Sequence, residues 1–120
     1  MSDNACSDVT GPIVCPNSVS LSVTAGTTPT FAWQPSCRAS SLFVTDPNTA
    51  STQWAINELP SSLDSQPMLP PVYYGILPPN MAGDSAKPLS AGVQYFVLLT
   101  KADPAFGLAG RPIGSALFTP

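Results

Sequence analysis

The chain has 120 residues, of which 43% are hydrophobic and 9% are charged, so it is long enough for one domain with a single core. The net charge is −3, and the four basic residues are scattered along the sequence at Arg38, Lys87, Lys101 and Arg111. This distribution offers no basic patch to nucleic acid or to an anionic membrane surface. Fifteen prolines and a scarcity of Glu, Lys and Arg disfavour helices and predict an all-β fold.

The first predicted element is a β-hairpin. Val19 and Leu21 alternate with serines, a turn follows around Gly26, and Phe31 and Trp33 resume the alternation. A turn centred near Gly26 pairs Val19 with Trp33 and Leu21 with Phe31, so that all four side chains face inward.

The same register predicts a disulfide. It places Cys15 opposite Cys37 on the inward face, at the open end of the hairpin, where a bridge is geometrically feasible. The alternative is two free buried thiols that behave as small apolar side chains. We favour the bridge, which small β-sandwiches outside the cytoplasm commonly use.

The third cysteine, Cys6, is left without a partner by this pairing. It is free, joins two chains or carries a lipid. The segment Cys6–Pro12 is similar to the start of a mature bacterial lipoprotein, in which a polar tether follows an acylated cysteine, although Asp3 and Asn4 depart from the usual signal. Residues 1–15 are therefore interpreted as a flexible N-terminal tether, and residues 16–120 as the folded domain. Met1–Ala5 is too short and polar to be a signal peptide, and no apolar run is long enough to span a bilayer.

The middle of the chain predicts a second pair of strands. Residues 41–46 and 52–57 flank a turn at Asp46–Thr49, where Asp and Asn side chains bond nearby backbone, and the register pairs Val44 with Trp54. A long Ser/Pro-rich connection, residues 59–71, is predicted to be loop. Residues 72–76 then form a fifth strand, which Pro78 and Pro79 end.

The clearest strand signal is the run Val93–Thr100, which follows a turn at Gly92. Tyr95, near its start, suits the tyrosine corner of an immunoglobulin-like sandwich. A second long loop covers residues 101–110, and residues 113–119 close the fold. The sequence thus predicts a single seven-stranded antiparallel β-sandwich of the immunoglobulin or fibronectin type III kind, with long Pro-rich loops.

Four segments carry a resemblance to a known group of domains: Thr30–Pro35, Trp54–Ile56, Pro71–Gly75 with Pro78, and Leu89–Tyr95. They resemble the successive landmarks of fibronectin type III-like and immunoglobulin-like domains of bacterial envelope lipoproteins. The resemblance covers residues 16–120 and implies that Trp33 is the core tryptophan. It also implies an extracytoplasmic protein, periplasmic or on the cell surface, with a lipid anchor at Cys6 as a candidate.

Catalysis finds little support in the sequence. The chain has no histidine, which excludes Ser-His-Asp and Cys-His devices and His-based metal sites. A Ser-Lys pair with Lys87 or Lys101 lies in no recognisable motif, and the seven acidic residues stand singly in the sequence. We therefore expect a protein that is not an enzyme and that uses no cofactor or metal.

Two non-catalytic functions remain. The first is an interaction module, such as an accessory extrinsic subunit on the outer face of a photosynthetic, respiratory or secretory membrane complex, because a small domain with so little charge must expose apolar surface. Its candidate interaction surface comprises Trp54, Pro67, Pro70, Pro71, Tyr73 and Tyr74. The second is a carbohydrate-binding or adhesion module, with Trp54, Tyr73, Tyr74 and Phe106 as a stacking platform. The alternation along the strand exposes only one of Tyr73 and Tyr74.

Overall fold

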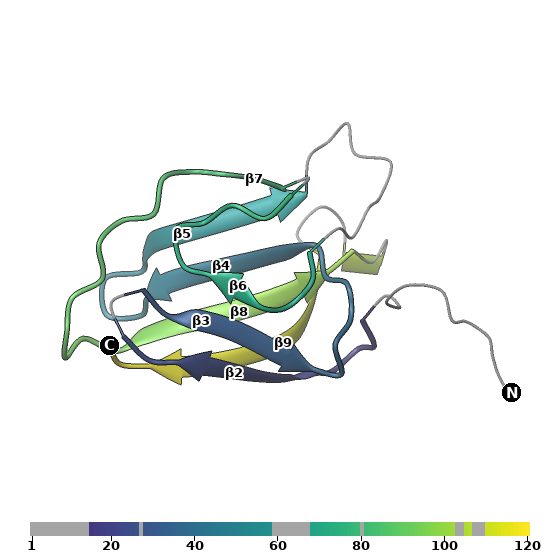
Figure 1. Ribbon diagram of the computed structural model, residues 1–120, viewed down its shortest axis with the longest axis horizontal. Coiled ribbons are helices and arrows are strands. Elements are labelled where there is room, and N and C mark those ends of the chain that lie inside the picture. The colour runs from purple at the N-terminus through teal and green to yellow at the C-terminus, as the bar shows by residue number, and fades with distance from the viewer. Residues whose placement is uncertain (1–14, 27, 59–67, 80, 103–104, 107–109) are drawn as a thin grey trace, which may run out of the picture.

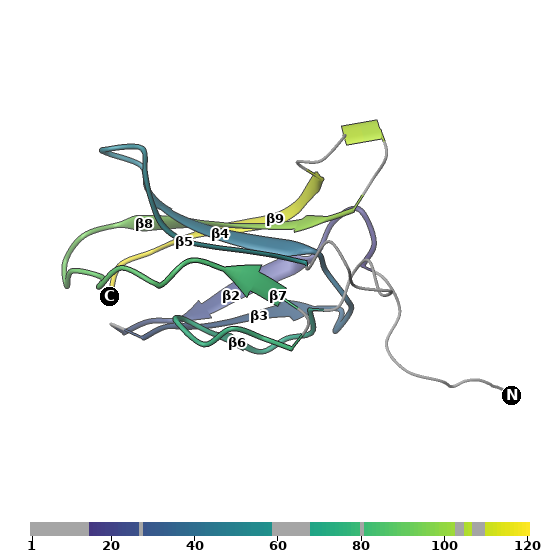
Figure 2. The same cartoon turned by 90° about the horizontal axis from the view of Figure 1, so that it is seen from above.

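The computed structural model describes residues 15–26, 28–58, 68–79, 81–102, 105–106 and 110–120. Within these residues the chain forms two antiparallel β-sheets and no α-helix. The two sheets lie face to face as separate layers, which are seen edge-on in Figure 2. The all-β prediction is confirmed, and the fold is sandwich-like.

The smaller sheet has three strands in the order β2-β3-β6. β2 (Ser20–Thr24) pairs with β3 (Thr30–Gln34), which pairs with the short β6 (Val72–Tyr73). Their inward residues are apolar and their outward residues are mostly serine and threonine, which is the alternation expected of a sheet with one solvated face.

The larger sheet has five strands in the order β7-β5-β4-β8-β9. Figure 1 shows these strands behind the smaller sheet. Their bounds are β4 (Ser41–Asp46), β5 (Ser51–Glu58), β7 (Met81–Gly83), β8 (Tyr95–Lys101) and β9 (Arg111–Phe118).

The strand count differs from the prediction, because the described residues form eight strands and not seven. The additional strand is β7, which pairs with the end of β5 through contacts such as Ile56 with Gly83. The predicted fifth strand is also shorter than expected. It ends at Tyr73, because Gly75 turns the chain with a φ of 86°, in the region that favours glycine.

The hairpin register was wrong by two residues. β2 pairs Leu21 with Trp33 and Val23 with Phe31, whereas a turn centred near Gly26 required Leu21 to face Phe31. A slip of two residues leaves every side chain on its predicted face, and hydrophobic alternation alone does not distinguish the two registers.

The core fills the space between the two sheets. Trp33 is 1% exposed and lies in this core. Phe31 of the smaller sheet meets Phe118 of the larger sheet edge-to-face, with ring centroids 5.8 Å apart, a favourable aromatic geometry. The predicted pairing of Val44 with Trp54 is confirmed, and so is the turn after β4, where the backbone N–H of Asn48 donates to Asp46 Oδ1 at 2.9 Å.

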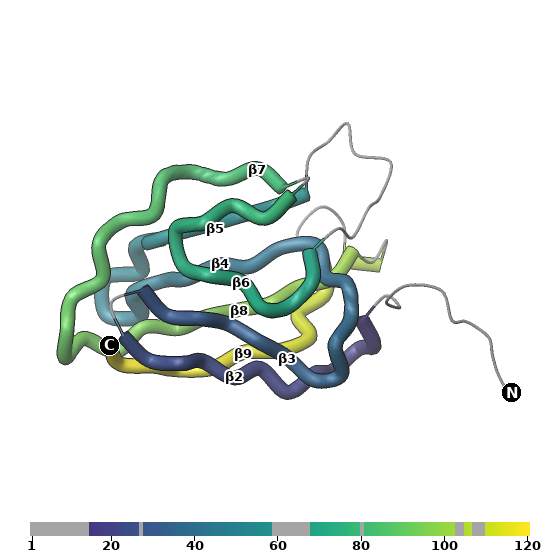
Figure 3. Tube along the Cα trace, viewed as in Figure 1, coloured from purple at the N-terminus to yellow at the C-terminus, as the bar shows by residue number. Residues whose placement is uncertain are grey.

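The two sheets approach each other closely where β2 passes β9. The N–H of Val19 donates to the carbonyl of Ile113 at 2.8 Å. A Cβ atom at Gly114 would lie 3.0 Å from Val19 Cγ2, so glycine permits this approach. At the other side of the sandwich the edge strands are β6 and β7. Figure 3 shows residues 74–79 leading from β6 toward β7.

Candidate functional site

The predicted disulfide joins Cys15 and Cys37, with a Cα–Cα distance of 4.8 Å. The pairing is confirmed, but the hairpin register from which it was predicted is not the observed one. The β2–β3 ladder ends at Ser20 and Gln34, and Cys37 lies beyond it, where Trp33 Nε1 donates to its carbonyl at 2.9 Å. A disulfide is compatible with an extracytoplasmic location. Cys6 and the rest of the proposed tether up to residue 14 lie outside the described residues.

The predicted corner at Tyr95 is also present as a hydrogen bond. The N–H of Ser90 donates to the Tyr95 hydroxyl at 2.8 Å, five residues upstream. Tyr95 is 3% exposed, and its ring lies against Phe118 with centroids 5.8 Å apart. This contact fixes the chain where it enters β8.

Two members of the predicted interaction surface lie in the core. Trp54 is 2% exposed and Tyr74 is 7% exposed, and their rings meet edge-to-face with centroids 5.2 Å apart. The prediction that both belong to the surface was therefore wrong. Aromatic residues on an inward face bury large apolar areas, and this gain decides the position of both rings.

Tyr74 joins parts of the two sheets. Its hydroxyl donates to the carbonyl of Lys87 at 2.6 Å and lies 3.4 Å from the carbonyl of Gln53 in β5. Burial of the side chain, with a smaller contribution from Tyr95, raises the pKa of Tyr74 from 10.0 to about 12. Its neutral form is therefore favoured, which suits a hydroxyl that donates to backbone oxygens.

The remaining predicted surface residues divide between exposed and undescribed positions. Tyr73 is 49% exposed, Pro71 is exposed and Pro70 is partly buried. Pro67 lies outside the described residues. The predicted alternation is confirmed at this strand, because Tyr73 faces outward while its neighbour Tyr74 faces the core.

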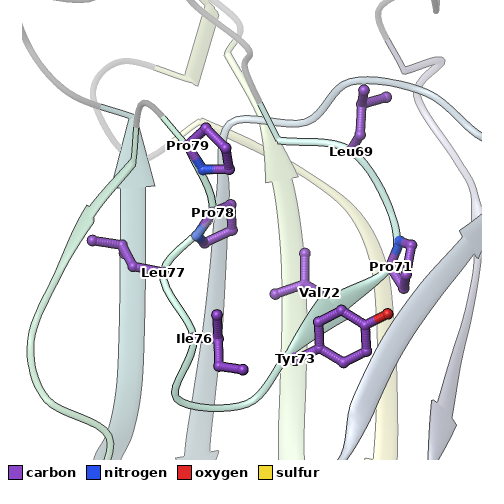
Figure 4. A pocket seen from close by; sticks show the side chains of 8 residues that line it. All are labelled: Leu69, Pro71, Val72, Tyr73, Ile76, Leu77, Pro78 and Pro79. Carbon is purple, nitrogen blue, oxygen red and sulfur yellow. The ribbon is translucent and has the colours of Figure 1, made fainter.

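Around Tyr73 the structure forms an apolar groove with a volume of about 320 Å³. The chain descends through Leu69 and Pro71, turns after Tyr73 and returns through Ile76, which gives the two arms seen in Figure 4. The lining side chains are uncharged and belong to Leu69, Pro71, Val72, Tyr73, Ile76, Leu77, Pro78 and Pro79. We call this site the β6 groove.

Exposed apolar side chains gather at the β6 groove. Among the described residues, six large hydrophobic side chains are exposed, and four of them line this groove: Leu69, Tyr73, Ile76 and Leu77, at 37%, 49%, 63% and 47%. The sequence prediction included Tyr73 and Pro71 but missed Ile76 and Leu77, because it assigned Ile76 to a strand.

Backbone hydrogen bonds hold the groove in shape. The N–H of Tyr74 donates to the carbonyl of Pro29 at 3.0 Å. The N–H of Ile76 donates to the carbonyl of Tyr73, also at 3.0 Å. The lining prolines Pro71, Pro78 and Pro79 have fixed φ angles. A site ordered in advance in this way loses little conformational entropy when a ligand binds.

A second apolar area lies on the outer face of the larger sheet. The strand register places Phe43 beside Leu98 and Phe96 beside Leu117. Phe43, Phe96 and Leu98 are partly buried by their neighbours, whereas Leu117 is 58% exposed. This face offers fewer exposed side chains than the β6 groove.

The stacking platform proposed for carbohydrate is dispersed. Trp54 and Tyr74 are buried, Tyr73 belongs to the smaller sheet, and Phe106 contacts Arg111 of the larger sheet, whose guanidinium carbon lies 5.0 Å from the ring centroid. These four rings form no common exposed surface.

The described residues offer no candidate metal site, whereas Lys87, one of the two lysines considered for a Ser-Lys pair, lines a pocket together with Asp84 and Ser85. No three residues of His, Cys, Asp or Glu lie close enough there to hold a metal ion. Lys101, the other of these two lysines, donates from Nζ to the carbonyl of Cys15 at 3.1 Å. No helix in these ranges is long and apolar enough to cross a membrane.

Comparison with known proteins found no matching family model, no matching curated protein and no matching solved structure.

Proposed function

We propose that this protein is a non-catalytic, extracytoplasmic interaction module that binds a protein partner through the β6 groove. The observation that carries the proposal is the concentration of four of the six exposed large hydrophobic side chains of the described residues at one ordered groove. A contiguous exposed apolar patch on a small soluble domain is typical of an interaction site.

The finer form of the proposal is an accessory extrinsic subunit that docks on the outer face of a membrane protein complex. The Cys15–Cys37 disulfide supports an oxidising compartment. A lipid on Cys6 would hold the domain beside the membrane, with residues 7–14 as the tether.

We further propose that the sandwich belongs to the immunoglobulin or fibronectin type III kind. Three features support this: the Tyr95 hydrogen bond to backbone five residues upstream, the buried Trp33 and the two antiparallel sheets. Because such sandwiches carry many unrelated functions, the fold itself does not select one.

The test is affinity capture from native membranes with the full chain as bait. The wild-type protein should recover a stoichiometric partner complex, and Ile76→Asp should lose most of it, because a carboxylate placed in the groove would be desolvated without a counter-charge. Leu117→Asp is the matched control, since it places the same charge at an exposed apolar side chain outside the groove. Equal recovery by wild type and Ile76→Asp would overturn the proposal, provided that thermal unfolding shows both to be folded.

A further inference from the structure

A β-bulge interrupts the edge of the larger sheet just after β7. Gly83 pairs with Ile56 of β5, and the N–H of Lys87 donates to the carbonyl of Gln53 at 2.9 Å. The edge segment takes four steps between these two contacts, whereas β5 takes three, so the edge segment carries one extra residue. Bulges of this kind redirect side chains and are over-represented beside active sites.

The bulge opens a pocket with a volume of about 300 Å³, at the lower end of the range for small-molecule sites, roughly 300–1,000 Å³. Most of its lining side chains carry a hydroxyl, amide or charged group, and they belong to Thr52, Gln53, Asp84, Ser85 and Lys87. We call this site the bulge pocket. It shares no lining residue with the β6 groove.

Hydrogen bonds on both sides hold the backbone of Lys87 in place. Its N–H donates to Gln53, and its carbonyl accepts the Tyr74 hydroxyl at 2.6 Å. The preceding residue, Ala86, packs against the core, whereas Ser85 and Lys87 are exposed, as alternation along an extended segment requires. The bulge pocket is therefore ordered in advance, which lowers the entropy lost when a ligand binds.

The bulge pocket carries one charge of each sign. Asp84 contributes a carboxylate and Lys87 an ammonium group to the same lining. Both side chains are exposed, and no ion pair with another described residue engages either of them. A simple anion would be attracted by Lys87 and repelled by Asp84, and a simple cation would meet the reverse. A ligand that carries both charges is complementary to both side chains.

The rest of the lining favours a small ligand. Trp54 and Ala55 provide the apolar part of the wall, which suits a short carbon side chain. A lipid headgroup with the same two charges would bring acyl chains, for which this mostly polar lining offers little apolar surface. A neutral sugar would leave both charged groups without a partner.

From these observations we infer that the bulge pocket binds a free α-amino acid. Asp84 holds its ammonium group, Lys87 holds its carboxylate, and its side chain lies against Trp54 and Ala55. The inference adds a small-molecule site to the protein. It does not depend on the proposed partner binding, because the β6 groove is a different site.

The test is NMR titration of the isotope-labelled full-length chain with each of the common L-amino acids at neutral pH. At least one should bind saturably below about 10 mM, and it should shift the amide signals of Asp84, Ser85 and Lys87 and the indole N–H signal of Trp54. Two analogues of that amino acid, the amine without its carboxylate and the acid without its amino group, should each bind at least about tenfold more weakly.

Two variants test the role of each charge. Asp84→Asn should remove the preference for the amino acid over the acid analogue, and Lys87→Met should remove the preference over the amine analogue. A merely structural defect would not change these preferences selectively. Asp46→Asn and Arg111→Gln are matched controls that remove the same charges outside the bulge pocket, and their affinities should stay within about twofold of wild type. Ile76→Asp should bind as wild type does.

The inference fails if no amino acid binds saturably, or if Asp84→Asn and Lys87→Met both bind like wild type. It fails equally if glucose or O-phosphoethanolamine binds more tightly than every amino acid, because the site would then serve a sugar or a lipid headgroup. Loss of binding in a folded Ile76→Asp would place the ligand in the β6 groove instead. Membrane capture tests the interaction module separately, so either proposal can fail while the other stands.

Discussion

The hydroxyl of Tyr74 donates to the carbonyl of Lys87 at 2.6 Å. Tyr74 directly follows β6 of the smaller sheet, and Lys87 is bonded through its N–H to Gln53 of the larger sheet at 2.9 Å. One phenol therefore links the two layers at the side where β6 and β7 are the edge strands. The same ring packs edge-to-face on Trp54 of the larger sheet.

Removal of this hydroxyl should weaken the fold. Tyr74→Phe keeps the ring and leaves the carbonyls of Lys87 and Gln53 without this donor, so the free energy of unfolding should fall by about 1–2 kcal/mol at neutral pH. Urea titration of wild type and variant measures the difference. Equal stability would show that water replaces the phenol at no cost.

The same residue should make the stability of the protein fall at alkaline pH. The pKa of Tyr74 is raised to about 12 in the folded state, against 10.0 for the ordinary group. The stabilisation is fully present below pH 10 and is lost as pH rises through 12, because the unfolded chain releases this proton first. Urea titrations across this window should show the stability difference between wild type and Tyr74→Phe shrinking as pH rises. A constant difference would contradict the shifted pKa.

Local signals in the sequence predicted much of this fold because they depend only on near neighbours. The turn at Asp46, the pairing of Val44 with Trp54 and the strand that begins near Tyr95 all follow from alternation and turn chemistry. The corner itself could be predicted because the tyrosine bonds its own chain five residues upstream.

The features that sequence reasoning missed depend on contacts distant along the chain. β7 has only three residues and forms through pairing with the end of β5, so it carries no alternation of its own. The placement of Trp54 and Tyr74 in the core depends on how the sheets stack. The β6 groove likewise requires Gly75 to reverse the chain, which exposes Ile76 on an arm that alternation assigned to a strand.

The tyrosine corner can be tested by a single substitution. Tyr95→Phe leaves the N–H of Ser90 without its acceptor and should destabilise the fold by about 1 kcal/mol or more. The measurement is the midpoint of denaturant unfolding. An unchanged dependence of the unfolding free energy on denaturant concentration would show that the folded and unfolded states keep their compactness. An unshifted midpoint would mean that the bond adds no stability.

The disulfide should be found by mass spectrometry of unreduced peptides, with Cys15 linked to Cys37 and Cys6 apart from both. Its loop spans 22 residues, so the double variant Cys15→Ser, Cys37→Ser should lose about 3 kcal/mol of stability in the chain-entropy model. Cys6→Ser is the control and should leave stability unchanged. Linkage of Cys6 to Cys15 would contradict both the pairing and the tether.

The last prediction separates binding from folding with two adjacent tyrosines. Tyr73 is 49% exposed in the β6 groove and Tyr74 is 7% exposed in the core. Tyr73→Ala should weaken capture of the partner complex while the melting temperature stays nearly unchanged, because it removes contact surface and no core packing. Tyr74→Ala should lower the melting temperature strongly, since truncation of a buried aromatic ring costs about 3–5 kcal/mol.

Salt gives this pair of variants an independent control. The lining of the groove is uncharged. Capture by the wild-type chain should therefore change little as the salt concentration rises and the Debye length shortens, whereas binding through an electrostatic interface would weaken. Loss of capture at high salt in the wild type, or full capture by Tyr73→Ala, would place the interface on another face of the sandwich. The combination of a salt-insensitive wild type and a folded but non-binding Tyr73→Ala is expected only if apolar side chains in the β6 groove provide the contact.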